Sequence, residues 1–118
     1  MAPINKQDLP IFSKWMDFLE WFFPLVDRFP QKARFSFATR LQNLSLDFVE
    51  DLVDARYRKE ARPILISASL RLEKLRIVLR LAWQQKYLSH KSFEQAQRNI
   101  DETGRMLGGW IRSLGAQV

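Results

Sequence analysis

The sequence contains no cysteine and a single histidine, His90, and these two scarcities exclude several kinds of chemistry. Without cysteine the chain forms no disulfide and no thiolate metal site. With one histidine it lacks the paired Glu-x-x-His motifs of dinuclear carboxylate bundles and the usual nucleophile–base pairs. We therefore expect no catalytic residue, no metal site, no cofactor and no enzymatic activity.

Glycine and proline are also scarce, with four and five residues respectively among 118. So few turn-forming residues indicate few, long secondary-structure elements. No window of about 20 residues is uniformly apolar, because Lys14, Asp17 and Glu20 interrupt the most hydrophobic stretch, residues 11–26. The first residues show no secretory signal pattern. These features predict one domain over residues 1–118, located in the cytoplasm and not in a membrane.

Apolar residues recur every three or four positions in four segments, and this spacing is typical of amphipathic helices. The predicted helices span residues 8–28, with Asp8 as N-cap and Pro24 as an expected kink, then 33–60, 63–87, and a fourth helix capped by Ser89. No β-alternation of useful length is present. Short connections between long helices make neighbours antiparallel, so we predict an all-α, up-down-up-down four-helix bundle.

Each predicted helix has one apolar face that is expected to form the core. Its members are Ile11, Trp15, Phe18, Phe22 and Val26; Phe37, Leu41, Leu44, Phe48, Leu52 and Ala55; Leu65, Ala68, Leu72, Leu75, Leu79 and Ala82; and Phe93, Ala96, Ile100, Leu107, Ile111 and Leu114.

The formal net charge of +6 lies in the second half of the chain. Residues 1–60 hold nine basic and nine acidic residues, whereas residues 61–118 hold ten basic and four acidic residues. Such an excess favours an anionic partner, which is nucleic acid, an acidic protein surface or an anionic membrane, although a solvated basic face is the simpler alternative. The predicted binding surface consists of Arg71, Lys74, Arg76, Arg80, Arg98, Arg105 and Arg112.

Three of these arginines, Arg98, Arg105 and Arg112, recur every seven residues. At ~100° per residue this spacing keeps them nearly in line along one helix. Two glycines in the same segment, Gly104 and Gly108, are four residues apart. Small residues at this spacing let two helix backbones approach closely, or else they mark a weak point in the helix.

The first two predicted helices carry more apolar residues than a single buried face requires. The surplus predicts a subunit interface of a homo-oligomer, with a broad core as the alternative. The expected interface residues are Phe12, Met16, Phe23, Leu46, Val49 and Val53. The acidic cluster Asp47, Glu50, Asp51 and Asp54 is interpreted as a solvated face, because no histidine accompanies it.

Several short motifs occur in an order that resembles a known family. They are Phe29-Pro30 followed by Arg34-Phe35, then Asp54-Ala55-Arg56-Tyr57, the run from Leu75 to Ala82, and the run from Gly104 to Trp110. The chain resembles the accessory variability determinant (Avd) proteins of diversity-generating retroelements. These proteins belong to a wider four-helix superfamily that includes proteins encoded in 23S rRNA intervening sequences.

The resemblance implies a basic, ring-shaped homopentamer of four-helix bundles. It also implies that the protein binds the element's reverse transcriptase and the template RNA, with the cDNA as a further ligand, and so supports mutagenic reverse transcription. The basic residues named above are the positions to which this role is assigned. Two alternatives stay open: an intervening-sequence protein without a polymerase partner, and a self-assembling interaction module that binds an acidic protein.

Overall fold

The structure, a computed structural model, describes residues 10–115, and helices account for most of this range. The long helices are α1 (Pro10–Asp27), α2 (Thr39–Tyr57), α3 (Ala61–Gln84) and α4 (His90–Gly115). A short 3₁₀ turn, η1 (Gln31–Ala33), and a π-helical turn, η2 (Arg34–Ala38), lead into α2. Residues 10–115 contain no strand, so the all-α prediction is confirmed. The predicted N-cap Asp8 lies outside the described residues.

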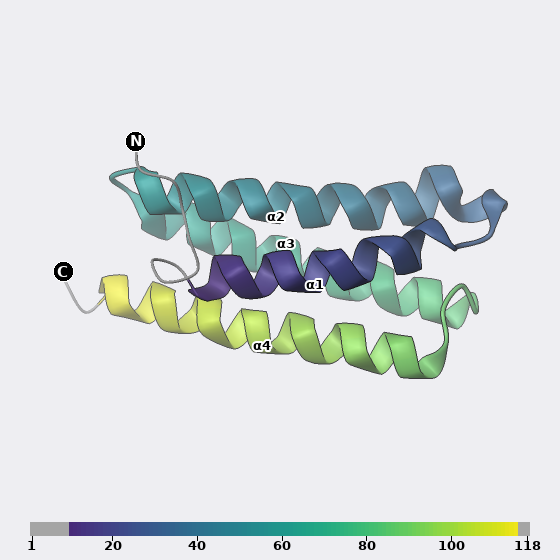
Figure 1. Ribbon diagram of the computed structural model, residues 1–118. Helices are drawn as coiled ribbons and strands as arrows, with labels where there is room; N and C mark the ends of the chain where they lie inside the picture. Colours follow the sequence, from purple (N-terminus) through teal and green to yellow (C-terminus); the bar gives the residue numbers. More distant parts are fainter. Residues whose placement is uncertain (1–9, 116–118) are drawn as a thin grey trace.

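The four long helices run alternately up and down in an elongated bundle measuring 47 × 25 × 22 Å (Figure 1). α2 packs most extensively against α3, and α3 packs next most extensively against α4. α1 completes the bundle by contacting both α2 and α4. This arrangement confirms the predicted up-down-up-down topology. Among residues 10–115, no helix combines the length and apolarity that a membrane span requires.

The predicted core faces are confirmed most fully on α1 and α3, where every named residue is buried. In the second predicted helix only Phe37, which lies in η2, is half-buried. On α4 the half-buried members are Phe93, Ile111 and Leu114, and all four of these residues pack against the core. Trp15 joins α1 to α2, because its indole N–H donates to the Ser45 carbonyl at 3.1 Å. The burial of these four stripes is the main stabilising contribution to the bundle.

Capping interactions, and not the spacing of apolar residues, determine where α3 ends and α4 begins. The predicted N-cap Ser89 is confirmed, since its hydroxyl accepts a hydrogen bond from the Ser92 N–H at 3.1 Å. α3 ends at Gln84 because Lys86 adopts a left-handed conformation with φ of 66°. There the Tyr87 N–H donates to the Ala82 carbonyl at 3.0 Å, the hydrogen bond of a Schellman motif. The third helix therefore stops three residues before the predicted end.

The start of the second predicted helix also differs from expectation. Residues 33–38 form the end of η1 and the π-helical turn η2, and α2 begins only at Thr39 and ends at Tyr57. Two hydroxyls stabilise this turn: Thr39 donates to the Arg34 carbonyl at 2.6 Å, and Ser36 donates to the Ala33 carbonyl at 3.4 Å. The first helix is closer to prediction, because α1 continues through Pro24 to Asp27.

Candidate nucleic-acid interface

The seven basic residues predicted to bind an anionic partner fall into two groups. Arg71 belongs to the first group, because its guanidinium is held between α3 and α2. Its Nε lies 2.7 Å from Asp51 Oδ2, and its Nη1 lies 3.5 Å from Asp47 Oδ2. The hydrogen bond to Asp51 raises the pKa of Arg71, and the negative charges of Asp51, Asp47 and Glu50 act in the same direction. Arg71 thus joins two helices and has little freedom to contact phosphates.

Arg76 is engaged in the same way between α3 and α4. Its Nη1 lies 2.6 Å from Glu73, and its Nη2 lies 2.9 Å from Asp101 on α4. The side chain passes over Gly104, where an added Cβ would lie 3.8 Å from Arg76 Nη2. Arg76 therefore connects two helices through carboxylates from both of them.

The expectation that Gly104 and Gly108 bring two helix backbones together is wrong. The nearest atom to a Cβ at Gly108 would be Arg112 Nη1 at 3.3 Å, and no atom of another helix backbone lies within 4 Å of either position. α4 also continues unbroken to Gly115. A Cβ at Gly104 would make only an ordinary contact, and one at Gly108 would be tight only against the flexible end of the Arg112 side chain.

The second group consists of cations that are exposed and form no ion pair with another residue of the described range. We call it the α3–α4 basic surface; its members are Lys74, Arg80, Arg98, Arg105 and Arg112. They lie on two adjacent helices, and Lys74 and Arg80, six residues apart, are about 240° apart around α3.

Two cations of this surface affect the pKa of the nearby Glu102 carboxyl. The Glu102 carboxylate forms an ion pair with Lys14 at 2.7 Å. The hydrogen bond that Lys14 donates in this pair is the largest cause of the lowered pKa of Glu102. The positive charges of Arg105 and Arg98 lower the pKa of Glu102 further, so both guanidinium groups lie close enough to act on it. Glu102 forms its ion pair with Lys14, and neither Arg105 nor Arg98 forms an ion pair with Glu102.

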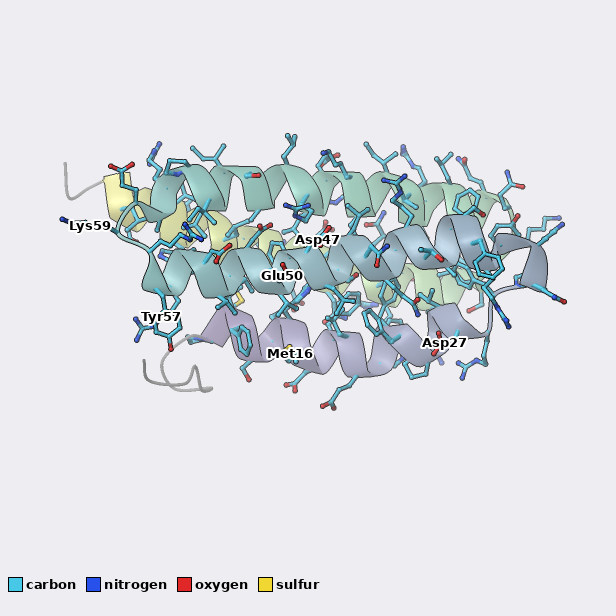
Figure 2. The ribbon with its side chains drawn as sticks, turned by 90° about the horizontal axis from the view of Figure 1, so that it is seen from above. Met16, Asp27, Asp47, Glu50, Tyr57 and Lys59 are labelled. Atoms are coloured by element: carbon cyan, nitrogen blue, oxygen red, sulfur yellow. The ribbon has the colours of Figure 1, made fainter. Side chains whose placement is uncertain are left out.

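Sequence reasoning missed the exposed cations at the ends of the bundle. One set surrounds the α2–α3 connection: Arg56, Lys59 and Arg62, with Lys59 at one end of the molecule in Figure 2. The other set lies in or beside the α1–α2 and α3–α4 connections, which Figure 1 shows at the opposite end of the bundle: Arg28, Lys32, Arg34, Arg40, Lys86 and Lys91. The net charge of residues 1–60 is zero, so the count of charges gave no sign that cations gather at the helix ends. Several of its carboxylates lie along the middle of α1 and α2, away from the helix ends.

The predicted interface residues are only partly available at the surface. Met16 and Leu46 are 40% and 45% exposed, and Figure 2 shows Met16 at the surface of α1 alongside α2. Phe12, Phe23 and Val49 are half-buried and pack against the core, and Val53 is half-buried as well. The broad-core alternative therefore accounts for part of the apolar surplus.

A larger exposed apolar stripe lies on α3 and was not predicted. It consists of Ile66, Leu70, Ile77 and Leu81, and Leu70 is 61% exposed. The stripe adjoins a groove of about 650 Å³ whose lining includes Pro63, Ile66, Leu70 and Ile111. Its spacing of four, seven and four residues is a helical repeat that could have revealed it. We call it the α3 apolar stripe.

The acidic cluster on α2 does not resemble a catalytic site. Asp47 and Asp51 pair with Arg71, Asp54 lies 3.5 Å from Arg58, and Glu50 is exposed at the centre of the helix (Figure 2). Within residues 10–115, no group of three or more His, Cys, Asp or Glu side chains could hold a metal ion. The cluster contributes mainly to helix pairing.

Comparison with known families assigns the chain to one of them. A family model described as bAvd-like matches residues 9–114, which include all four long helices. A search of curated proteins finds no match. The similarity suggested by the short motifs therefore extends over almost the whole chain.

Proposed function

The chain belongs to the bAvd-like family, and from this premise we propose that it is a non-enzymatic accessory protein of a diversity-generating retroelement. In this role it binds the element's reverse transcriptase and its template RNA, and the cDNA as it forms, and so supports mutagenic reverse transcription. The observation that carries the proposal is the α3–α4 basic surface, five exposed cations on adjacent helices that form no ion pair within residues 10–115.

The basic surface supports binding to phosphates in general. Cations that replace condensed counterions give an affinity that falls with rising salt concentration. Contacts to the phosphate backbone position a nucleic acid but carry no sequence information. Selection of the template therefore depends on RNA shape or on the reverse transcriptase.

Self-association is part of the proposal, with the pentameric ring that the family resemblance implies. A ring needs a heterologous contact between two different faces of the subunit. The chain offers two apolar faces of this kind: the α3 apolar stripe, and the surface around Met16 and Leu46. Repeating the basic surface around a ring raises the avidity for a long polyanion without any new contact.

The first test compares two double variants with equal charge changes. Arg80→Gln/Arg98→Gln removes two unpaired cations, whereas Arg71→Gln/Arg76→Gln removes two paired ones. We expect mobility-shift titrations with the template RNA to show weaker binding for the first variant and a much smaller change for the second. Equal losses would show that the α3–α4 basic surface is not the binding site.

The second test concerns the polymerase. We expect a reverse-transcriptase gene beside the gene for this protein. The wild-type protein should co-purify with that enzyme and increase cDNA synthesis from the template RNA. RNA binding without capture of the polymerase would contradict the retroelement role and favour an intervening-sequence protein. Failure to bind RNA, combined with capture of an acidic protein, would favour the interaction-module alternative.

A further inference from the structure

Phe35 is the most exposed large hydrophobic side chain in residues 10–115, with 87% of its surface accessible. It belongs to the π-helical turn η2, which precedes α2. Phe37, two residues later, is half-buried and packs edge-on against Tyr87 with ring centroids 5.4 Å apart. The packing of the bundle therefore uses the Phe37 ring and leaves the Phe35 ring exposed to solvent.

The backbone that carries Phe35 is fixed by hydrogen bonds on both sides. Ser36 donates to the Ala33 carbonyl, and Thr39 donates to the Arg34 carbonyl, as described above. An aromatic side chain on such a backbone has few degrees of freedom to lose when it binds a ligand. The turn thus presents the ring as a preorganised surface.

Phe35 also borders a groove of about 350 Å³ along the first turns of α2. The other residues of the groove are mostly polar: Ser36, Thr39, Arg40, Asn43, Leu44 and Asp47. Figure 2 shows Asp47 on the part of α2 where the groove ends. The groove therefore combines an aromatic ring, a cation, an amide and a carboxylate.

Three of these groups are available for a ligand. Arg40 is exposed and forms no ion pair with another described residue, and Arg34, next to Phe35, is in the same state. The side-chain amide of Asn43 is exposed and makes no hydrogen bond within residues 10–115. Asp47 keeps one long contact to Arg71, at 3.5 Å, and can accept further hydrogen bonds.

We propose that this groove binds an unpaired nucleotide of a single-stranded nucleic acid, with the base stacked on Phe35. The guanidinium groups of Arg40 and Arg34 meet the adjacent phosphates, and the Asn43 amide faces the edge of the base. Amide side chains suit base edges because they donate and accept hydrogen bonds side by side. The inference rests on the proposed nucleic-acid binding and adds a base-contacting site to it.

The chemistry of the groove favours a nucleotide over an apolar protein segment. Apart from Phe35, Leu44 is the only apolar residue in its lining, and Leu44 is buried. A protein anchor would need more exposed apolar surface around the ring. Single-strand binders, in contrast, combine stacking aromatics with a cationic track, and this is the combination present here. Bases inside a duplex are already stacked, so the site selects single strands.

The test uses fluorescence anisotropy to measure binding of the full chain to a pair of oligomers of equal length, and to a third oligomer made of RNA. One is oligothymidylate, and the other is an abasic phosphodiester that keeps the charges and lacks the bases; oligouridylate serves as the RNA arm. We expect Phe35→Ala to weaken binding of the base-bearing oligomers by at least about fivefold, the low end of base–aromatic stacking, and to leave the abasic oligomer unaffected. Phe35→Trp should retain the affinity.

Gln95→Ala is the control, because it removes an exposed, uncharged side chain on α4 that lies outside the groove and outside the faces proposed for assembly. It should leave both affinities unchanged. If Phe35→Ala alters neither affinity, or weakens both equally, the stacking site is refuted while the proposed function stands. If the wild-type protein binds none of the oligomers and no template RNA, the proposed function itself fails.

Discussion

The α3–α4 ion pair between Arg76 and Asp101 provides a gain-of-function test, Asp101→Asn. Asp101 Oδ1 accepts from Arg76 at 2.9 Å through Nη2 and at 3.2 Å through Nε. Replacing the carboxylate with an amide removes one negative charge beside the α3–α4 basic surface. It also frees part of the Arg76 guanidinium to face solvent. We therefore expect tighter binding of single-stranded RNA.

The magnitude follows from one added phosphate contact. On a single strand each contact steepens the plot of log affinity against log salt by about 0.7. At about 0.1 M salt, one such contact corresponds to roughly a fivefold gain in affinity. The cost to folding is small, because a solvent-exposed ion pair contributes about 0–1 kcal/mol and Arg76 keeps its contact with Glu73 at 2.6 Å.

The assay is fluorescence anisotropy with a single-stranded RNA over a range of salt concentrations. Asp17→Asn is the matched control, because Asp17 is an exposed carboxylate on α1 that forms no ion pair within residues 10–115. It changes the net charge equally but lies on a helix that contributes nothing to the basic surface. If Asp101→Asn binds no more tightly than Asp17→Asn, the assignment of the surface to α3 and α4 is wrong.

Three further predictions concern stability and assembly. Lys86→Gly should raise the free energy of unfolding by about 1 kcal/mol, and the melting temperature by roughly 4 °C, because Lys86 occupies a left-handed position that glycine adopts without strain; an unchanged melting curve would contradict this. Leu70→Lys should lower the mass measured by light scattering while the circular dichroism spectrum stays helical; an unaltered mass would exclude the α3 apolar stripe from the assembly. Glu102 has a lowered pKa in the folded state, so its contribution to stability is present above the ordinary glutamate range and is lost as the pH falls through the folded-state pKa. Urea denaturation should therefore show a gap between wild type and Glu102→Gln at neutral pH that closes in strong acid; a gap that widens in acid would refute the ion pair with Lys14.

The core faces of the helices were predictable because they depend on local periodicity. Trp15 and Phe22 are seven residues apart, as are Leu72 and Leu79, so each pair lies about two turns apart on one helix face, and all four are buried. The ends of helices were less predictable. Lys86 terminates α3 in a conformation that its residue type disfavours, so no signal in the sequence marked it.

The candidate site was only partly predictable for a different reason. Arg71 and Arg76 look like the other basic residues in the sequence. Apart from Glu73, which lies on α3 beside Arg76, their carboxylate partners are on other helices, 20 to 25 residues away along the chain. Only the rotation of α3 relative to α2 and α4 determines which cations meet a carboxylate. Net charge counts formal charges and cannot separate paired cations from unpaired ones.

The exposure of Phe35 was also hard to predict from the sequence. Its aromatic neighbours Phe29 and Phe37 pack into the bundle, whereas the Phe35 ring is 87% exposed. The π-helical turn and the start of α2 decide that Phe35 faces solvent. The signal available in the sequence was its position off the apolar stripe that begins at Phe37.

The salt dependence of RNA binding tests the central claim most directly. Neutralising Arg80, Arg98 and Arg105 together removes three unpaired cations, so the slope of log affinity against log salt on single-stranded RNA should become shallower by about 2. Circular dichroism should show the same helical content as the wild type. A variant that keeps its fold and the full wild-type slope would contradict the assignment of phosphate binding to the α3–α4 basic surface.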